Sequence, residues 1–278
     1  MDLLQAFILG IVEGLTEYLP VSSTGHLLLA QRLMGIPSST ASDAFAICIQ
    51  AGAILAVLGL YRKRVGEMML GVVGRDESGR KLAICLIAAF VPAAALGFVL
   101  EKTIKKYLFA GEAWGMWPVV AAWFVGGVAI LAVSFWQKRN PGRSRNLSLT
   151  DLTVRMAVIV GVAQCLAMWP GVSRSLITIV GGLLVGLSLP AAVELSFLLG
   201  LLTLTAATAY DFLKHGSEML EVFGVAPLLV GFAAAWISAI LAVKWMVGYI
   251  NKHGMAVFGW YRVLLAIAVT IWILRSGQ

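Results

Sequence analysis

Apolar residues gather in six long stretches, and the short segments between them hold most of the Lys and Arg residues. A helix needs roughly 17 to 20 apolar residues to cross the hydrocarbon core of a bilayer. Each stretch meets that length, and no segment between them is long enough to form a soluble domain. We therefore predict six transmembrane helices, at about 43–61, 82–100, 117–135, 192–210, 227–247 and 255–274.

Two other apolar segments are shorter, and a polar turn interrupts each of them. The first pattern predicts helices at about 3–18 and 25–35, and the second predicts helices at about 154–168 and 175–188. The Pro, Gly and Ser residues of the turns leave backbone groups that hydrocarbon cannot satisfy. Such backbone is tolerated at membrane depth only where protein buries it or where it lines a wet cavity. We predict two re-entrant helix–turn–helix hairpins.

The two interrupted segments resemble each other. Aligned without gaps, Gly161–Ser175 lies 151 positions after Gly10–Thr24. Four pairs are identical, namely Gly10/Gly161, Leu15/Leu166, Val21/Val172 and Ser22/Ser173. We interpret the chain as one membrane domain over 1–278 that contains a duplication, with repeat 1 at about 1–136 and repeat 2 at about 150–278.

The two repeats should have opposite orientations in the membrane. A re-entrant hairpin returns to its own side, so each repeat crosses the membrane three times. Basic residues favour the cytoplasmic side, and they follow the first and third spans: Arg62, Lys63, Arg64, Arg75, Arg80 and Lys81, then Lys138, Arg139, Arg143 and Arg145. A loop expected at 211–226 is acidic instead, with Asp211, Glu218 and Glu221. The two turns then meet near the midplane, where inverted repeats commonly place a binding site.

Composition and charge agree with a membrane protein. Hydrophobic residues make up 60% of the chain and charged residues only 13%, whereas soluble domains are about one quarter charged. The net charge of +7 comes from the short loops, so it indicates membrane topology and no nucleic-acid partner. The three cysteines lie in apolar stretches without metal-ligand spacing, which argues against a disulfide framework and a zinc site.

The first turn carries residues suited to hydrolysis: Glu13, Glu17, Ser22, Ser23, Thr24 and His26. Glu13 and Glu17 are four positions apart, so they share one face of a helix. A hydroxyl cluster with nearby acids and an imidazole has the outline of a nucleophile, a base and an orienting group. The alternatives are a helix end at the water interface for the two acids and a structural hydrogen bond for His26.

The second turn carries the groups of an anion site. Arg174 lies among three hydroxyl residues, Ser173, Ser175 and Thr178, at the start of a helix. A helix N-terminus and a guanidinium both bind phosphate well. A structural ion pair of Arg174 with Glu13 or Glu17 is the alternative, and the two roles are compatible before substrate arrives. The first turn thus supplies acid, base and nucleophile candidates, and the second supplies the anion clamp.

These motifs resemble the undecaprenyl-diphosphate phosphatase family, also called the bacitracin-resistance protein family. Its E/Q-x-x-x-E motif is similar to Glu13–Glu17, and its P-G-x-S-R-S-x-x-T motif is similar to Pro170–Thr178. The resemblance implies hydrolysis of undecaprenyl diphosphate to undecaprenyl phosphate and phosphate in the bacterial plasma (inner) membrane. It also implies recycling of a lipid carrier for cell-wall polysaccharides, bacitracin resistance, and dependence on Mg²⁺ or Ca²⁺, with Glu13 and Glu17 as candidate ligands.

Several mechanistic alternatives stay open at this level. Ser23 is the candidate nucleophile, with His26 or Glu17 taking its proton, or else Glu17 or His26 activates a water directly. A transporter or flippase for polyprenyl phosphate would also suit inverted repeats with broken helices. Glycine-rich spans pack equally well within or between chains, so a homodimer is also open. The charge pattern favours a site that is open to the periplasm, among membrane lipids.

Overall fold

The computed structural model describes residues 1–37, 39–104, 115–139 and 146–276. Within these ranges the chain is helical and contains no β-strand, which confirms the all-α prediction. The helices, with two short 3₁₀ turns, are α1 (Leu3–Thr16), α2 (Ser23–Leu33), α3 (Thr40–Leu60), α4 (Arg62–Val72), α5 (Glu77–Ile104), α6 (Trp117–Arg139), η2 (Leu149–Asp151), α7 (Val154–Gln164), η3 (Cys165–Met168), α8 (Arg174–Leu184), α9 (Leu189–Phe223), α10 (Val225–His253) and α11 (Ala256–Ser276).

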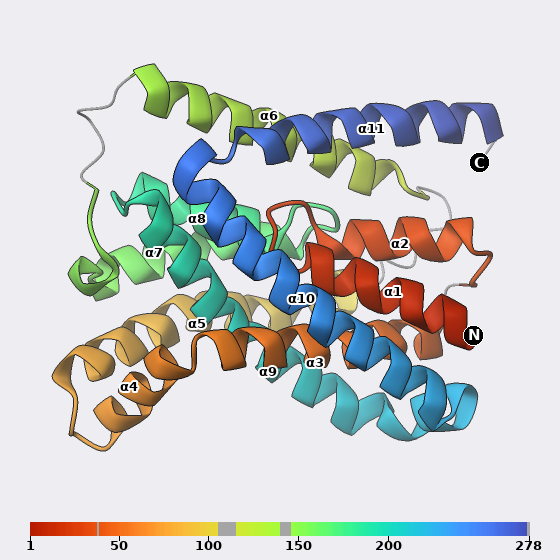
Figure 1. The fold of residues 1–278 in the computed structure, drawn as a ribbon, viewed down its shortest axis with the longest axis horizontal. Coiled ribbons are helices and arrows are strands. Elements are labelled where there is room, and N and C mark those ends of the chain that lie inside the picture. Colours follow the sequence, from red (N-terminus) through yellow and green to blue (C-terminus); the bar gives the residue numbers. More distant parts are fainter. Residues whose placement is uncertain (38, 105–114, 140–145, 277–278) are drawn as a thin grey trace.

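Most helices run along the long axis of the molecule, and α6 and α11 lie side by side along one edge (Figure 1). In the described part of the chain, five helices are long and apolar enough to cross a membrane: α5, α6, α9, α10 and α11. A sixth span is obtained if α3 and α4 are counted together, although a 79° bend separates them. All six predicted apolar stretches therefore fall on long helices.

The short helices lie in two pairs at opposite ends of the molecule. In Figure 1, α1 and α2 occupy the end that holds the N-terminus, α7 and α8 occupy the other end, and the two connecting turns meet near the centre. Capping fixes where each pair begins, because Asp2 accepts a hydrogen bond from Gln5 N and Thr153 accepts one from Met156 N. The observed bounds match the predicted helix–turn–helix segments to within a few residues.

Small residues let α1 approach α10 closely. A Cβ atom added at Gly10 would overlap the carbonyl oxygen of Gly231, and one added at Gly14 would overlap Ser238 and Ala235. Helix pairs in membranes rely on such small-residue contacts, because lipid provides no hydrophobic drive for helices to associate. This contact places the apolar side of α1 against a long helix and directs Glu13 and Glu17 into the protein.

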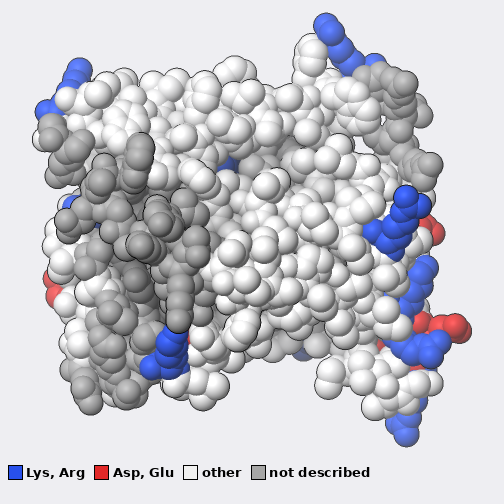
Figure 2. All heavy atoms as spheres, turned by 180° about the vertical axis from the view of Figure 1, so that it is seen from behind, with Lys and Arg blue, Asp and Glu red and all other residues white. Residues whose placement is uncertain are grey.

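Charged side chains gather at the two ends of the long axis, and the band between them is largely uncharged (Figure 2). One end carries the exposed basic residues around α4, namely Arg62, Lys63, Arg75, Arg80 and Lys81, together with Lys138 and Arg139. Arg143 and Arg145 lie outside the described residues, as do the side chains of Glu218 and Glu221. This distribution indicates that the helices cross the bilayer roughly along the long axis.

The prediction of a loop at 211–226 is wrong, because α9 continues to Phe223. Only its Leu189–Lys214 part is apolar enough to span a membrane. Hydropathy marks where a chain leaves hydrocarbon, but a helix can continue into the aqueous phase because its backbone bonds are internal. The helix ends at Gly224, whose φ of 69° is a conformation that glycine adopts readily.

Candidate functional site

The two turns have the same unusual backbone. Ser22 has φ 74° and Ser173 has φ 79°, and each is the residue before the helix that follows its turn. Apart from Asn146, they are the only non-glycine residues with positive φ in the described part of the chain. These two serines are equivalent in the 151-residue alignment. A strained conformation is costly and clusters at functional sites, so both turns are candidates for function.

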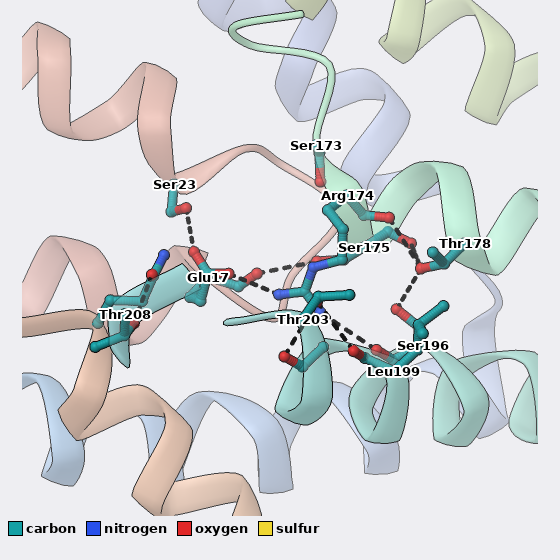
Figure 3. Close-up of polar contacts among 12 residues, drawn as sticks. Glu17, Ser23, Ser173, Arg174, Ser175, Thr178, Ser196, Leu199, Thr203 and Thr208 are labelled. Atoms are coloured by element: carbon teal, nitrogen blue, oxygen red, sulfur yellow. Dashed lines mark hydrogen bonds and ion pairs between the residues drawn. The ribbon is translucent and has the colours of Figure 1, made fainter. Parts of the chain in front are cut away.

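Glu17 connects the two turns (Figure 3). Its Oε1 accepts a hydrogen bond from Arg174 Nη2 at 2.7 Å, and its Oε2 accepts one from the Ser23 hydroxyl. The Ser175 hydroxyl also donates to the backbone oxygen of Glu17 at 2.9 Å. The carboxylate is only 7% exposed, so it does not lie at the water interface. The structure thus confirms the ion pair of Arg174 with one of the two acids.

Arg174 reaches Glu17 across the face of α9. Its Nη1 donates to Ser196 O at 3.3 Å, and its guanidinium carbon lies 5.5 Å from the centre of the Tyr18 ring. Its buried Nε has no hydrogen-bond partner among the described residues. An unsatisfied buried donor costs about 1–3 kcal/mol, so the protein's own groups do not fully satisfy this guanidinium.

Gly200 on α9 makes room for this side chain. A Cβ atom added at Gly200 would overlap Arg174 Nη1. We expect Gly200→Ala to displace the guanidinium from Glu17 and to lower phosphate release, the activity that the family resemblance implies, at least about tenfold, since small misplacements at a reacting centre can cost up to about 10²-fold.

The matched control is Gly248→Ala on α10, where an added Cβ would meet no atom within 4 Å. Purified variants are compared by the initial rate of phosphate release and by the melting temperature in detergent. Equal rates for the two alanine variants would contradict the expectation.

Glu13 is buried beside Glu17 without a donor. It is 1% exposed, and neither of its oxygens accepts a hydrogen bond from a described residue. Glu17 follows one helical turn later, with helical backbone at the C-cap of α1, so the two carboxyl groups lie on one face. A buried carboxyl group with uncommitted oxygens beside a second carboxyl group favours a bound proton or a cation. No group of three or more His, Cys, Asp or Glu residues in the described ranges could hold a metal ion alone.

A cavity of about 620 Å³ opens beside the Glu17–Arg174 pair. One end is polar and is lined by Glu17, Ser22, Ser23, Thr24, Ser173 and Arg174. The rest of the wall is mostly apolar and includes Phe90, Ala93, Ala94, Gly97, Phe98, Met168, Trp169, Leu204, Ala206 and Ala207. Four of the predicted hydroxyl residues and the Arg174 guanidinium therefore line one end of a mostly apolar cavity, which suits an amphiphilic anion.

Four predicted site residues do not line this cavity: Glu13, His26, Ser175 and Thr178. Both ring nitrogens of His26 are engaged, one 2.7 Å from Ser22 O and the other 2.7 Å from the hydroxyl of Tyr261. Thr178 donates to the hydroxyl of Ser196 at 2.7 Å, and Ser175 is bound to the backbone of Glu17. The structure therefore joins Ser23 to Glu17 and not to His26, while Ser175 and Thr178 hold the turn in place.

Polar residues on the spans complete the cavity, and the sequence interpretation did not single them out as site residues. Thr208 on α9 donates to Gln50 Oε1 on α3 at 3.2 Å, and both helices contribute to the cavity wall. Gln164, which the 151-residue alignment pairs with Glu13, lines the cavity, and its Oε1 has no partner among the described residues. An isolated amide side chain within an apolar stretch was the available signal.

Fold and site together define a helical membrane protein with a buried carboxylate, hydroxyl and guanidinium cluster at the end of an apolar cavity. This chain belongs to the family described as Bacitracin resistance protein BacA, whose sequence profile matches residues 6–268.

Similar proteins named "Undecaprenyl-diphosphatase" occur in several bacteria. The one from Sorangium cellulosum is 43% identical over 97% of this chain and 85% of its own length. The one from Bradyrhizobium diazoefficiens is 41% identical over 95% of both chains, and the one from Methylococcus capsulatus is 44% identical over 96% of this chain and 94% of its own length. The predicted family resemblance is thereby confirmed.

Proposed function

We propose that this protein hydrolyses undecaprenyl diphosphate to undecaprenyl phosphate and inorganic phosphate, and so recycles the lipid carrier for peptidoglycan and other cell-wall polysaccharides. The observation that carries the proposal is the Glu17 carboxylate, which binds both the Ser23 hydroxyl and the Arg174 guanidinium at the polar end of an apolar cavity. Bacitracin resistance is the phenotype that the family name implies.

The diphosphate binds at the polar end, and the polyprenyl chain lies along the apolar wall. The guanidinium of Arg174 supplies several N–H donors to the phosphate oxygens. The Ser173 oxygen accepts a hydrogen bond from Leu176 N at 3.2 Å, so its hydroxyl proton is available to donate to the phosphate. Helices α2 and α8 both begin at this end, at Ser23 and Arg174. The partial positive charge at each helix N-terminus favours a bound anion. The same groups balance the charge that develops on the leaving lipid phosphate.

Glu17 is the proton acceptor that the geometry favours. The Ser23 hydroxyl already donates to its Oε2, so the proton can pass to the carboxylate as Ser23 Oγ forms a bond to the terminal phosphorus. The bridging P–O bond breaks, and undecaprenyl phosphate leaves with the electron pair. Water then attacks the phosphorus of the phosphoserine, the P–Oγ bond breaks, Ser23 Oγ recovers the proton held by Glu17, and phosphate is released. In the alternative route, Ser23 orients a water that loses its proton to Glu17.

These two routes differ in one testable intermediate. If Ser23 is the nucleophile, acid quench within the first turnover of terminally ³²P-labelled substrate traps label on the protein, and Ser23→Ala abolishes both the label and most of the hydrolysis. Thr24→Ala is the matched control, since Thr24 lines the same cavity without bonding to Glu17, and it should retain the label. Absence of label in wild-type protein during active turnover would refute the covalent route.

We propose further that Glu13 and Glu17 hold Mg²⁺ or Ca²⁺ together with phosphate oxygens. The uncommitted, buried oxygens of Glu13 fit this role, and magnesium is commonly bound by one or two carboxylates plus substrate phosphates. When bound, the cation would neutralise phosphate charge. The protein's own part is to keep Glu13 close to Glu17, which the packing of Gly14 on α10 enforces.

Topology and location are also part of the proposal. The alternating helix directions in Figure 1, the opposite ends occupied by the two short pairs and the positive φ of Ser22 and Ser173 support two inverted repeats with re-entrant hairpins. The basic end around α4 would face the cytoplasm of a bacterial plasma membrane. The cavity, which reaches Tyr210 and Asp211 on α9, would then open to the periplasm.

Hydrolysis in detergent tests this function against the alternative of lipid transport. Solubilised protein separates no compartments, so a transporter would leave the diphosphate intact. We expect purified protein with Mg²⁺ to convert undecaprenyl diphosphate into undecaprenyl phosphate, identified by mass spectrometry. Intact substrate after incubation with folded protein would overturn the proposal and favour a transport assay in vesicles.

A further inference from the structure

Arg262 on α11 is a buried arginine that the mechanism above does not use. Its side chain is 0% exposed, and its guanidinium donates to four backbone carbonyl oxygens. The acceptors are Ala122 at 2.7 Å, Gly171 at 2.9 Å, Pro20 at 3.2 Å and Trp123 at 3.3 Å. One side chain therefore joins α6, the first turn and the second turn.

The two turn carbonyls are equivalent positions. Gly171 lies 151 positions after Pro20, the same offset that relates the two repeats. Pro20 lies three residues before Ser23, and Gly171 lies three residues before Arg174. A single rigid guanidinium therefore binds the equivalent carbonyl oxygen of both turns. It fixes the distance between the turns at points three residues from Ser23, the candidate nucleophile, and from Arg174, the anion-binding residue.

The site of Arg262 is built for a guanidinium. A Cβ atom added at Gly126 on α6 would overlap Arg262 Nη2, so this glycine leaves the space that the group occupies. Among the described residues no carboxylate forms an ion pair with Arg262. A buried charge without a counter-ion is expensive within a membrane, which argues against a role limited to holding α11 on α6.

We propose that Arg262 is a positioning residue for hydrolysis, which aligns Ser23 and Glu17 on the first turn with Arg174 on the second. This inference rests on the proposed function, because it assigns Arg262 a role in that reaction. Loss of the bridge would let the turns separate while leaving each turn's own groups intact. Substrate would still bind to Arg174, but the attacking oxygen would be misplaced.

The test compares Arg262→Met, Arg262→Lys and Gly126→Ala in steady-state phosphate release. We expect Arg262→Met to lower kcat about 100-fold with KM within about threefold of wild type, because misplacement of a reacting group by about 1 Å can cost that much. Lysine keeps the charge but cannot donate to all four carbonyl oxygens at once, so Arg262→Lys should lower kcat about tenfold. Gly126→Ala should also lower kcat, since it displaces the guanidinium without removing it.

Arg64→Met provides the structural control. Arg64 links α4 to Glu194 of α9 with a 2.7 Å ion pair that involves neither turn and does not line the cavity, so its loss should lower the melting temperature without changing kcat. If folded Arg262→Met keeps a wild-type kcat, the inference is overturned. If it does not fold, the kcat values of Arg262→Lys and Gly126→Ala decide. An inactive wild-type protein would instead refute the proposed function.

Discussion

Glu17→Gln is expected to reduce phosphate release from undecaprenyl diphosphate by about 10³-fold, within the range of about 10² to 10⁴ typical of a lost general base. The amide has the same size, and it can still accept a hydrogen bond from Arg174 or Ser23. It cannot take the proton that leaves Ser23 or an attacking water. The expected signature is a large fall in kcat with a folded protein.

Glu67→Gln is the matched control for this prediction. Glu67 also pairs with an arginine, because Arg64 Nη1 lies 3.0 Å from its Oε2, but its side chain is 44% exposed on α4. The same substitution there removes a similar ion pair away from the cavity, so hydrolysis should be unchanged. Comparable losses in both variants would show that the effect at Glu17 reflects a general loss of stability.

Arg174→Lys is expected to raise KM and to lower kcat/KM by about 10²-fold or more. Lysine keeps the charge but presents a point donor, whereas the guanidinium donates to Glu17 and to Ser196 O through separate nitrogens and, in the proposed mechanism, would also donate to the phosphate. Arg174→Met should do more damage, because it leaves a buried carboxylate unpaired. Breaking a buried pair in this way costs about 3–5 kcal/mol.

The two substitutions at Arg174 separate binding from folding. Arg174→Lys should remain folded, and its KM for the diphosphate reports the anion contact directly. Arg64→Lys, on the part-exposed pair with Glu194, controls for the exchange of one cation for another. An Arg174→Lys variant with wild-type kcat/KM would show that the guanidinium serves only as a structural partner of Glu17.

The sequence predicts the helices and the two turns well, because both signals are strong. Long apolar stretches require helices in a membrane, and Pro20 and Pro170 mark the breaks. The alignment of the two copies also places Glu17 and Arg174 near one another. Their contact at 2.7 Å follows from the same physical reasoning, since each charge is costly to bury alone.

Other features depend on side-chain directions that periodicity does not determine. His26 follows the hydroxyl cluster in sequence, but its ring stacks on Tyr261 with centroids 5.7 Å apart and its two nitrogens contact Ser22 O and the Tyr261 hydroxyl. Arg262 lies within the last predicted span, where a charged residue is itself a signal of function. Only the tertiary structure shows that it reaches both turns.

The measurement that tests the central claim most directly is a double-variant comparison of phosphate release. Glu17→Gln, Arg174→Met and the combined variant are assayed under single-turnover conditions, each confirmed as folded by size-exclusion chromatography in detergent. If the two turns form one hydrolytic site, the double variant loses little more than the worse single variant, because residues that act as a unit are strongly non-additive. Losses that multiply would mean that Glu17 and Arg174 act independently, and would contradict a single site built from both turns.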